Sequence, residues 1–204
     1  MLATLLGLIA PPRCALCARP GDSRFHLCTR CEHGLARLEP RWAHVPGLEA
    51  AWSAAPYESV ARELVVALKF AARLQLARRA AGLIAERAPP DLLQGTIVPV
   101  PAAPARRRWR GFDPAETIAA ALAAEAGLAM EPCLRRSQGP RQVGRRRSER
   151  LADPPHVRLD GAAPEGAILV DDVLTTGATL GACGRALRGG GCRRVVATTV
   201  ARSR

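Results

Sequence analysis

The sequence predicts an α/β protein: a mostly parallel sheet flanked by helices, with a small metal-binding segment near the N-terminus. Toward the C-terminus, an apolar run, a helical stretch and a second apolar run follow one another, which is the order of a strand–helix–strand unit in a parallel sheet. Near the N-terminus, four cysteines stand in two Cys-x2-Cys pairs. The chain has 204 residues, 48% of them hydrophobic, which is enough for one domain with a real core and a small appendage.

The four cysteines, Cys14, Cys17, Cys28 and Cys31, have the spacing of a zinc knuckle. Two residues between thiolates let both sulfurs turn toward one cation, and two such pairs complete the tetrahedral shell that suits Zn2+. Two disulfides, a redox-active pair and an iron–sulfur cluster are the alternatives. We expect structural zinc in a segment over residues 1–45 and a second domain over residues 46–204.

The expected compartment bears on these alternatives. The apolar first ten residues lack the positive start of a signal peptide and are about half as long as a membrane span, and no later stretch is long and apolar enough. We therefore expect no membrane span and a cytoplasmic location, where structural disulfides are rare. His26 and His33 are alternative ligands, although we expect both on the surface of the knuckle. The other three cysteines, Cys133, Cys183 and Cys192, share no ligand spacing and are expected to be buried apolar residues.

The middle of the chain alternates helical and strand patterns. Apolar residues recur at helical spacing in several segments, and Pro89-Pro90 ends one of them. A β-branched run that closes on prolines is typical of a buried strand feeding a loop. The stretch over residues 135–150 has no apolar periodicity, so we expect a mobile surface segment there. In order, the patterns predict a short helix and linker over 34–46, helices over 57–70 and 74–87, a strand over 96–101, and a helix from Asp113 or Pro114 to Gly127.

The C-terminal third is the most regular part of the sequence. Residues 167–170 form a continuous apolar run, typical of a strand that is covered on both faces. A loop, a helical stretch over 180–188 and a second strand over 194–200 follow. Ligands of open α/β sheets bind beyond the carboxyl ends of the strands, so the loop after Val170 is the expected functional site.

This loop combines two acids with three threonines and a glycine. Residues 175–179 offer three threonine hydroxyls around the flexible Gly177, directly before a helix N-terminus whose free N–H groups attract anions. The pattern predicts a phosphate-binding loop. Asp171 and Asp172 would repel phosphate, and carboxylates instead suit sugar hydroxyls, a metal ion or a developing positive charge. The combination indicates a ribose 5-phosphate binder, and a plain helix cap beside two solvated acids is the alternative.

The stretch Val170–Thr179 resembles the motif with which type I phosphoribosyltransferases bind 5-phosphoribosyl 1-pyrophosphate (PRPP). The rest of the chain is similar to one branch of these proteins, the ComF family of competence-associated proteins. The chain departs from the family pattern at Asp113, Pro114 and Asp153. Besides the four cysteines, the similarity covers Ala67–Phe70, Val98–Pro101, Arg110–Phe112, Gln142 with Ser148–Arg150, and Val200–Arg202.

The resemblance implies a type I phosphoribosyltransferase fold that binds PRPP with Mg2+ and serves DNA uptake in natural transformation. Asp171 and Asp172 would then be the catalytic acids, which meet the ribose hydroxyls directly or through Mg2+. The implied PRPP site comprises Val170, Asp171, Asp172, Leu174, Thr175, Thr176, Gly177, Ala178 and Thr179. On the pyrophosphate side, the candidates are Lys69, Pro99, Val100, Pro101, Arg110 and Arg150.

Half of the net charge of +12 lies in residues 135–150, and a second basic run surrounds Trp109. Residues 135–150 hold seven arginines against one glutamate, and four arginines surround Trp109 within residues 106–110. Three interpretations are open: a lid that closes over pyrophosphate, a track for single-stranded DNA with Trp109 stacked on a base, and a solvated, codon-biased surface. The expected partners are therefore PRPP or another ribose 5-phosphate, with single-stranded DNA or a DNA-uptake protein beside it. A non-catalytic DNA- or protein-binding accessory that kept the fold is the alternative function, since no general base defines an acceptor.

Overall fold

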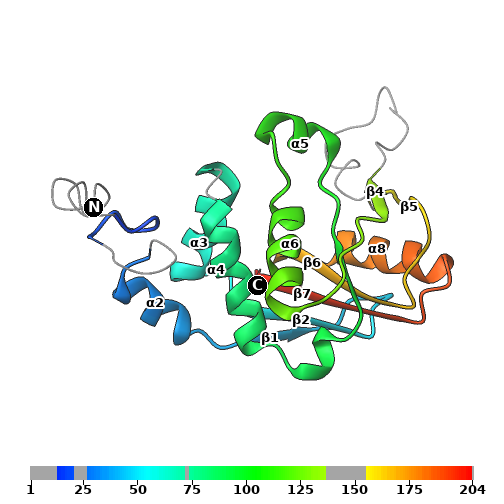
Figure 1. The fold of residues 1–204 in the computed structure, drawn as a ribbon, viewed down its shortest axis with the longest axis horizontal. Helices are drawn as coiled ribbons and strands as arrows, with labels where there is room; N and C mark the ends of the chain where they lie inside the picture. The colour runs from blue at the N-terminus through cyan, green and yellow to red at the C-terminus, as the bar shows by residue number, and fades with distance from the viewer. Residues whose placement is uncertain (1–12, 21–26, 72–73, 137–154, 204) are drawn as a thin grey trace.

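The computed structural model describes residues 13–20, 27–71, 74–136 and 155–203 and shows a mixed α/β fold (Figure 1). Its five-stranded sheet has the order β1-β2-β7-β6-β3, in which only the edge strand β1 runs antiparallel to its neighbour. The strands are β1 (Arg41–Ala43), β2 (Ala50–Pro56), β3 (Thr96–Pro99), β6 (Gly166–Leu174) and β7 (Arg194–Arg202), and a separate antiparallel pair joins β4 (Leu134–Arg136) to β5 (Val157–Leu159).

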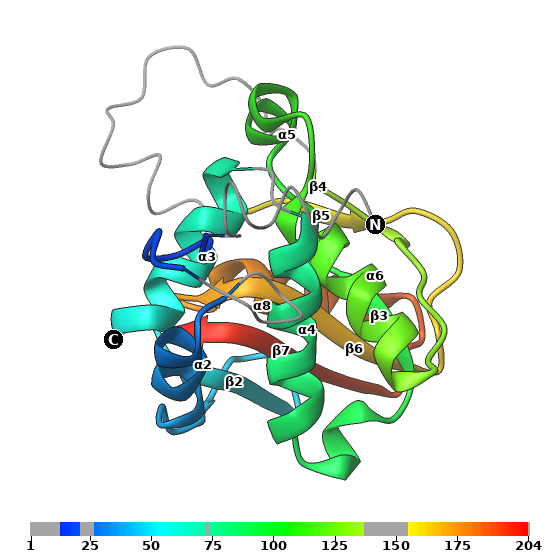
Figure 2. The same ribbon diagram turned by 60° about the vertical axis from the view of Figure 1, so that its left-hand side comes forward.

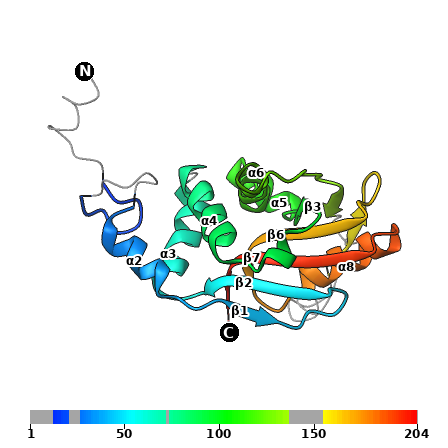
Figure 3. The ribbon, with the colours of Figure 1, turned by 60° about the horizontal axis from the view of Figure 1, so that its bottom comes forward.

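Helices cover both faces of the sheet (Figure 3). On one face, Ile168 and Val170 of β6 share a buried cluster with Ile118 of α6. On the other face, Leu169 of β6 shares a second cluster with Leu187 of α8. Successive side chains of a strand point to opposite faces, so the apolar run of β6 supplies both cores at once. The first face carries α3 (Ser59–Ala71), α4 (Leu74–Arg87) and α6 (Pro114–Ala126), and the second carries α8 (Ala178–Gly189).

Strand β6 is much longer than its neighbour β3, and this difference shapes the site. Residue pairing between β3 and β6 ends at Pro99 and Val170, whereas β6 continues beside β7 as far as Leu174. Asp171 and Asp172 therefore lie within the strand, in its last residues, and not in the loop that the sequence predicted. The prediction ended the strand early because carboxylates are rare in a covered strand, where only the loss of β3 leaves room for them.

Several predicted elements are confirmed. Helix α4 spans the predicted residues 74–87, and α3 and β3 start or end within two residues of the predicted bounds. Asp113 is the N-cap of α6, where its Oδ1 accepts a hydrogen bond of 3.1 Å from the N–H of Ala115. Within the basic stretch 135–150, where the sequence predicted a mobile surface segment, residues 135 and 136 lie in strand β4, and residues 137–150 lie outside the described residues.

Two predictions about the N-terminal half were wrong. The short helix does not follow the knuckle: α2 (Thr29–Ala36) begins directly after Cys28 and contains Cys31. The predicted linker contains strand β1, and β2 was missed altogether, because its sequence AAWSAAP is rich in alanine, which favours helix over strand.

Helix α2 is joined firmly to the helical face of the sheet and lies beside α3 (Figure 2). Arg79 of α4 forms a 2.8 Å ion pair with Glu32 of α2. The guanidinium group of Arg87 donates hydrogen bonds to the carbonyl groups of Ala36, Leu38 and Ala54, which lie in α2, after it and in β2. These contacts satisfy carbonyl groups at the end of α2 and bind the cysteine-bearing segment to the sheet. The division into domains at residue 45 stays a prediction.

None of the helices in the described part of the chain has both the length and the apolar composition needed to cross a bilayer.

Candidate functional site

The first candidate site is the cluster of the four predicted cysteines. Their sulfur atoms all lie within 4.8 Å of one another. The Sγ atoms of Cys14 and Cys31 are 3.7 Å apart, and those of Cys17 and Cys28 are 3.5 Å apart. A zinc ion with Zn–S bonds of about 2.3 Å holds tetrahedral sulfurs about 3.8 Å apart. The cluster therefore has the composition and dimensions to hold a metal ion such as zinc.

Local backbone structure brings the two cysteine pairs together. In the first pair, the N–H of Ala18 donates to the carbonyl of Cys14 at 2.9 Å and closes a tight turn. In the second pair, Cys28 precedes α2 and Cys31 lies in its first turn. Three of the four cysteines are buried in the same cluster as α3 and α4, so the four-cysteine cluster adjoins the main core. His33 is exposed and lies outside the cluster, and His26 falls outside the described residues.

The thiols of the cluster differ in acidity. Burial raises the pKa of Cys14, but hydrogen bonds from the backbone N–H groups of Cys17, Cys28 and Leu16 outweigh it and bring that pKa to about 6. Burial, followed by the neighbouring thiols, raises the pKa of Cys31. A metal ion that binds all four thiolates must therefore displace protons from the less acidic ones.

The three remaining cysteines are buried, as predicted. Burial raises the pKa of Cys183 to about 12. Such thiols are not nucleophiles at neutral pH and act as small apolar side chains.

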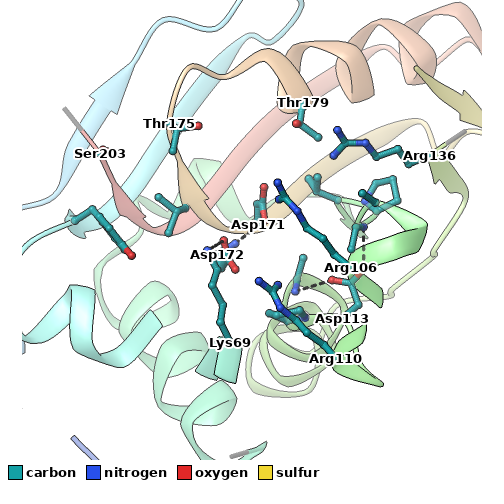
Figure 4. Close-up of a pocket in the computed structure, with 18 residues that line it drawn as sticks. Lys69, Arg106, Arg110, Asp113, Arg136, Asp171, Asp172, Thr175, Thr179 and Ser203 are labelled. Atoms are coloured by element: carbon teal, nitrogen blue, oxygen red, sulfur yellow. Dashed lines mark hydrogen bonds and ion pairs between the residues drawn. The ribbon is translucent and has the colours of Figure 1, made fainter. Parts of the chain in front are cut away.

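The second candidate site is a polar cavity of about 280 Å3 at the carboxyl ends of β6 and β7 (Figure 4). We call it the main cavity. Its walls come from the end of β6, from the turn after β3, from α3 and α5 (Pro104–Arg110), and from β4. The charged residues that line it are Lys69, Arg106, Arg110, Arg136, Asp113, Asp171 and Asp172.

The two adjacent acids of β6 are held in different ways. Oδ1 of Asp171 accepts a 2.8 Å hydrogen bond from the backbone N–H of Asp172. Oδ1 of Asp172 lies 3.0 Å from Nζ of Lys69. Burial and the adjacent charge of Asp172 raise the pKa of Asp171 well above its ordinary value. Burial also raises the pKa of Asp172, although Lys69 opposes this effect.

Three arginines face these acids across the cavity. Arg106 and Arg110 point from α5 toward the acid pair, and Arg136 approaches from β4 beside Thr179 (Figure 4). Burial and the nearby Arg106 lower the pKa of Arg136, yet a guanidinium stays charged in proteins. An anion that enters the cavity therefore meets several fixed positive charges.

The loop between β6 and α8 forms a small hollow of about 40 Å3 next to the main cavity. Gly177 has the left-handed φ of 77° and precedes the first turn of α8 without a side-chain cap. A Cβ at this position would lie 2.9 Å from Cγ2 of Val45, so the glycine is needed for space as well as for φ. Thr175 and Thr179 line both hollows and connect them.

The predicted PRPP-site residues fall into three groups. Asp171, Asp172, Thr175 and Thr179 line the main cavity, and Leu174, Thr176, Gly177 and Ala178 line only the smaller hollow. Val170 lines neither, because it is fully buried in the core. On the pyrophosphate side, the main cavity brings Lys69, Val100, Pro101 and Arg110 together, whereas Pro99 lines a separate cavity and Arg150 lies outside the described residues.

The main cavity also contains residues that the sequence did not assign to the PRPP site, among them Tyr57, Arg106, Asp113, Arg136 and Ser203. Ser203 directly follows β7, so the rule that placed a site after Val170 would have found it as well. Tyr57 directly follows β2, a strand that the sequence did not reveal. Its backbone N–H donates to the carbonyl of Arg202 at 2.7 Å, which places both residues at the same edge.

The fold and the two sites define a mixed α/β protein whose mostly parallel sheet carries a polar cavity, with a four-cysteine cluster at its N-terminal end. No protein-family model matches the chain, and no curated protein matches it.

Proposed function

We propose that the chain is a ComF-type protein with the type I phosphoribosyltransferase fold, and that its main cavity binds PRPP with Mg2+. The observation that carries the proposal is the meeting of three chemistries in one cavity. The acid pair of β6, the threonine loop before α8 and the cationic groups of α3, α5 and β4 line the same hollow. PRPP carries a diol, a phosphate and a pyrophosphate, and each matches one of these groups.

The 5-phosphate of the ligand fits the loop between β6 and α8. Thr175 and Thr179 offer hydroxyl groups there, and the first residues of α8, at the positive end of the helix dipole, line the same hollow. Arg136 lies beside Thr179 and supplies a full positive charge (Figure 4). This end of the cavity has the donors that a phosphate monoester requires.

The ribose fits above the acid pair, and the pyrophosphate fits among the remaining cations. Carboxylates of Asp171 and Asp172 accept hydrogen bonds from the sugar hydroxyls. Lys69, Arg106 and Arg110 line the same cavity as the acids and the turn at Val100 and Pro101. Mg2+ bound with the ligand would neutralise part of the pyrophosphate charge.

The proposed chemistry is transfer of the phosphoribosyl group. The bond between C1 and the pyrophosphate oxygen breaks, pyrophosphate leaves with the electron pair, and an acceptor forms the new bond at C1. Positive charge develops on the ribose during this step, and the carboxylates beside it stabilise that charge while the cations stabilise the leaving group. The acceptor is left unassigned.

We propose that this binding serves DNA uptake in natural transformation. The support is the resemblance of the chain to the ComF family, which extends from the cysteines to the last strand. A cytoplasmic location fits this role, because four cysteines without disulfide bonds persist in a reducing compartment.

Titration calorimetry with PRPP and Mg2+ tests the proposal. The wild type should bind PRPP. The variants Asp171→Asn and Asp172→Asn should bind it at least roughly tenfold more weakly, since each variant loses an ionic acceptor for the ribose. Asp91→Asn removes an exposed carboxylate outside the cavity and is the matched control. Absence of binding by the wild type would refute the proposal.

One observation favours a second function, the binding of single-stranded DNA by a non-catalytic accessory protein. Trp109 is 73% exposed on α5, between arginines that also reach solvent. An exposed aromatic ring with flanking guanidinium groups suits base stacking and phosphate contacts. Fluorescence anisotropy with an oligonucleotide tests this function: Trp109→Ala should weaken binding roughly tenfold, and binding should fall steeply as salt rises. Equal affinity of the two proteins would exclude this surface.

A further inference from the structure

A single carboxylate, that of Asp113, fastens together the two ends of the segment between β3 and α6. We call residues 102–113 the α5 arm, since α5 forms most of it. Oδ2 of Asp113 accepts a 2.9 Å hydrogen bond from the backbone N–H of Ala102, eleven residues earlier in the chain. Oδ1 of the same carboxylate accepts from the N–H of Ala115 at 3.1 Å. Asp113 is only 7% exposed, so both bonds are sheltered from water.

Only short stretches of chain connect α5 to the hydrogen bond between Ala102 and Asp113. Ala103 is the N-cap of α5 and directly follows Ala102. At the other end, the helix stops at Gly111, whose left-handed φ of 75° turns the chain back toward Asp113. Short connections of this kind make the orientation of α5 depend on how its two ends are fastened.

The arm carries two of the cations of the main cavity. Arg106 and Arg110 stand four residues apart on α5 and therefore on one face of the helix. Both line the cavity and point toward the acid pair (Figure 4). Ala102, whose N–H is held by Asp113, lines the cavity as well, next to the turn at Val100 and Pro101.

We propose that Asp113 is a positioning residue, which holds the α5 arm so that Arg106, Arg110 and the turn at residues 100–102 surround the diphosphate of the ligand. The proposal rests on the proposed binding of PRPP and adds to it the group that orders the diphosphate end. In this role Asp113 acts through the backbone of Ala102 and through α5, and not as a ligand-binding group.

A plain helix cap does not account for this arrangement. Capping α6 requires one side-chain oxygen, and asparagine and serine cap helices about as well as aspartate. The second oxygen of Asp113 instead holds a residue outside the helix. Aspartate can accept both N–H groups at once, whereas asparagine has only one acceptor oxygen, and its amide group would oppose one of the two donors.

The negative charge of Asp113, taken alone, predicts a change in pyrophosphate affinity that is opposite to the change predicted by a positioning role. Removing a carboxylate from the wall of an anion site favours anions, so an electrostatic role alone predicts tighter binding of pyrophosphate by Asp113→Asn. A positioning role predicts weaker binding, because the two guanidinium groups are no longer held in place. The direction of the change therefore separates the two roles.

The experiment compares wild type, Asp113→Asn and Asp113→Ser by calorimetry with inorganic pyrophosphate, with ribose 5-phosphate and with PRPP, each with Mg2+. Both variants keep a capping group for α6 and lose the paired bond, so we expect roughly tenfold weaker binding of pyrophosphate and PRPP and unchanged binding of ribose 5-phosphate. Hydrogen exchange of the Ala102 amide should be faster in both variants. Asp91→Asn, in which the lost carboxylate is exposed and outside the cavity, should match the wild type throughout.

Three results would overturn the inference. Pyrophosphate that binds the variants as tightly as the wild type, or more tightly, removes the positioning role. An equal loss for ribose 5-phosphate and pyrophosphate shows a general structural role instead. If the wild type binds neither PRPP nor pyrophosphate, the proposed function itself fails and this inference with it, whereas either of the first two results leaves the proposed function intact.

Discussion

The ammonium group of Lys69, at the end of α3, lies 3.0 Å from Oδ1 of Asp172, in the last part of β6. The side chains of the two residues are 22% and 12% exposed, so the pair is largely screened from bulk water. Lys69 is the one lysine of the sequence, and it stands where a cation counteracts the burial of a carboxylate. A pair of this kind favours the ionised form of an acid, which burial disfavours.

Replacing Lys69 by methionine should therefore weaken PRPP binding and change its dependence on pH. Burial already raises the pKa of Asp172, and Lys69 is the largest opposing influence, so its removal raises that pKa further. We expect roughly tenfold weaker binding at neutral pH. The affinity of Lys69→Met should also decline at a higher pH than that of the wild type as the solution is acidified. Lys69→Arg retains the charge and should stay close to the wild type; a methionine variant with an unaltered pH profile would contradict the role of the pair.

Asp171→Asn should stabilise the fold at neutral pH while impairing the site. Burial, and then the charge of Asp172, raise the pKa of Asp171 well above the ordinary 3.8, so the folded protein holds this proton more tightly than the unfolded chain. Stability from this proton is complete below pH 3.8 and is lost as the pH rises through the folded-state pKa. Asparagine removes the charge and keeps an oxygen for the N–H of Asp172.

Thermal denaturation between pH 4 and pH 8 measures this effect. The variant should gain about 1–2 kcal/mol at pH 7 and almost nothing at pH 4. Asp172→Asn is the contrasting control, because it strips the partner from Lys69 and should not stabilise. A gain that is the same at every pH would show that protonation of Asp171 is not its cause.

Gly177→Ala should be destabilising for two separable reasons. The residue has a φ of 77°, and an added Cβ would lie 2.9 Å from Cγ2 and 3.2 Å from Cγ1 of Val45. We expect a loss of about 2–3 kcal/mol in the free energy of unfolding, together with weaker binding of ribose 5-phosphate. In a double-mutant cycle with Val45→Ala, the contact part should be recovered and the backbone part should remain. Full additivity of the two changes would exclude the contact as a cause.

A zinc ion held by the four cysteines should stabilise the α-helical face, so loss of that ion should lower the stability of the fold. Cys17 is the exposed member of the cluster, so Cys17→Ser takes little apolar packing from the core and mainly breaks the metal shell. We expect loss of bound zinc and a decrease of more than about 2 kcal/mol in the free energy of unfolding, because metal binding contributes to folding. His33→Ala, at an exposed position outside the cluster, should retain zinc and stability. Zinc analysis and chemical denaturation of both variants measure the two effects. If the wild type is as stable without the metal as with it, the prediction is wrong.

The sequence-based predictions agree with the structure where they depended on strong local signals. The spacing of Cys14 to Cys31, the cap at Asp113 and the apolar run before Asp171 each depend on a few neighbouring residues, and the structure places all of them as local rules require. The threonine loop likewise lies between a strand and a helix N-terminus.

The remaining features depend on partners far away in the chain. Strand β2 consists largely of alanine and is a strand because β7 pairs with it, which no local pattern reveals. Tyr57 enters the cavity only as a result of that pairing. In the sequence, Arg106 and Arg136 are members of basic stretches and are not distinguished from their neighbours. Arg106 reaches the cavity because the α5 arm is fastened at Asp113, and Arg136 reaches it because β4 pairs with β5.

The unequal lengths of β3 and β6 have a consequence for the main chain. Main-chain groups of a strand alternate between its two neighbours, and the carbonyl of Val170 accepts from Val100 on the β3 side at 3.0 Å. The main-chain groups of Asp172 face the same side, beyond the point where β3 stops. Its N–H is taken up by Asp171, which substitutes for the missing strand. The cavity therefore borders an uncovered ladder edge of β6. If PRPP binds there as proposed, we expect part of the hydroxyl recognition to persist even when both carboxylates have been replaced.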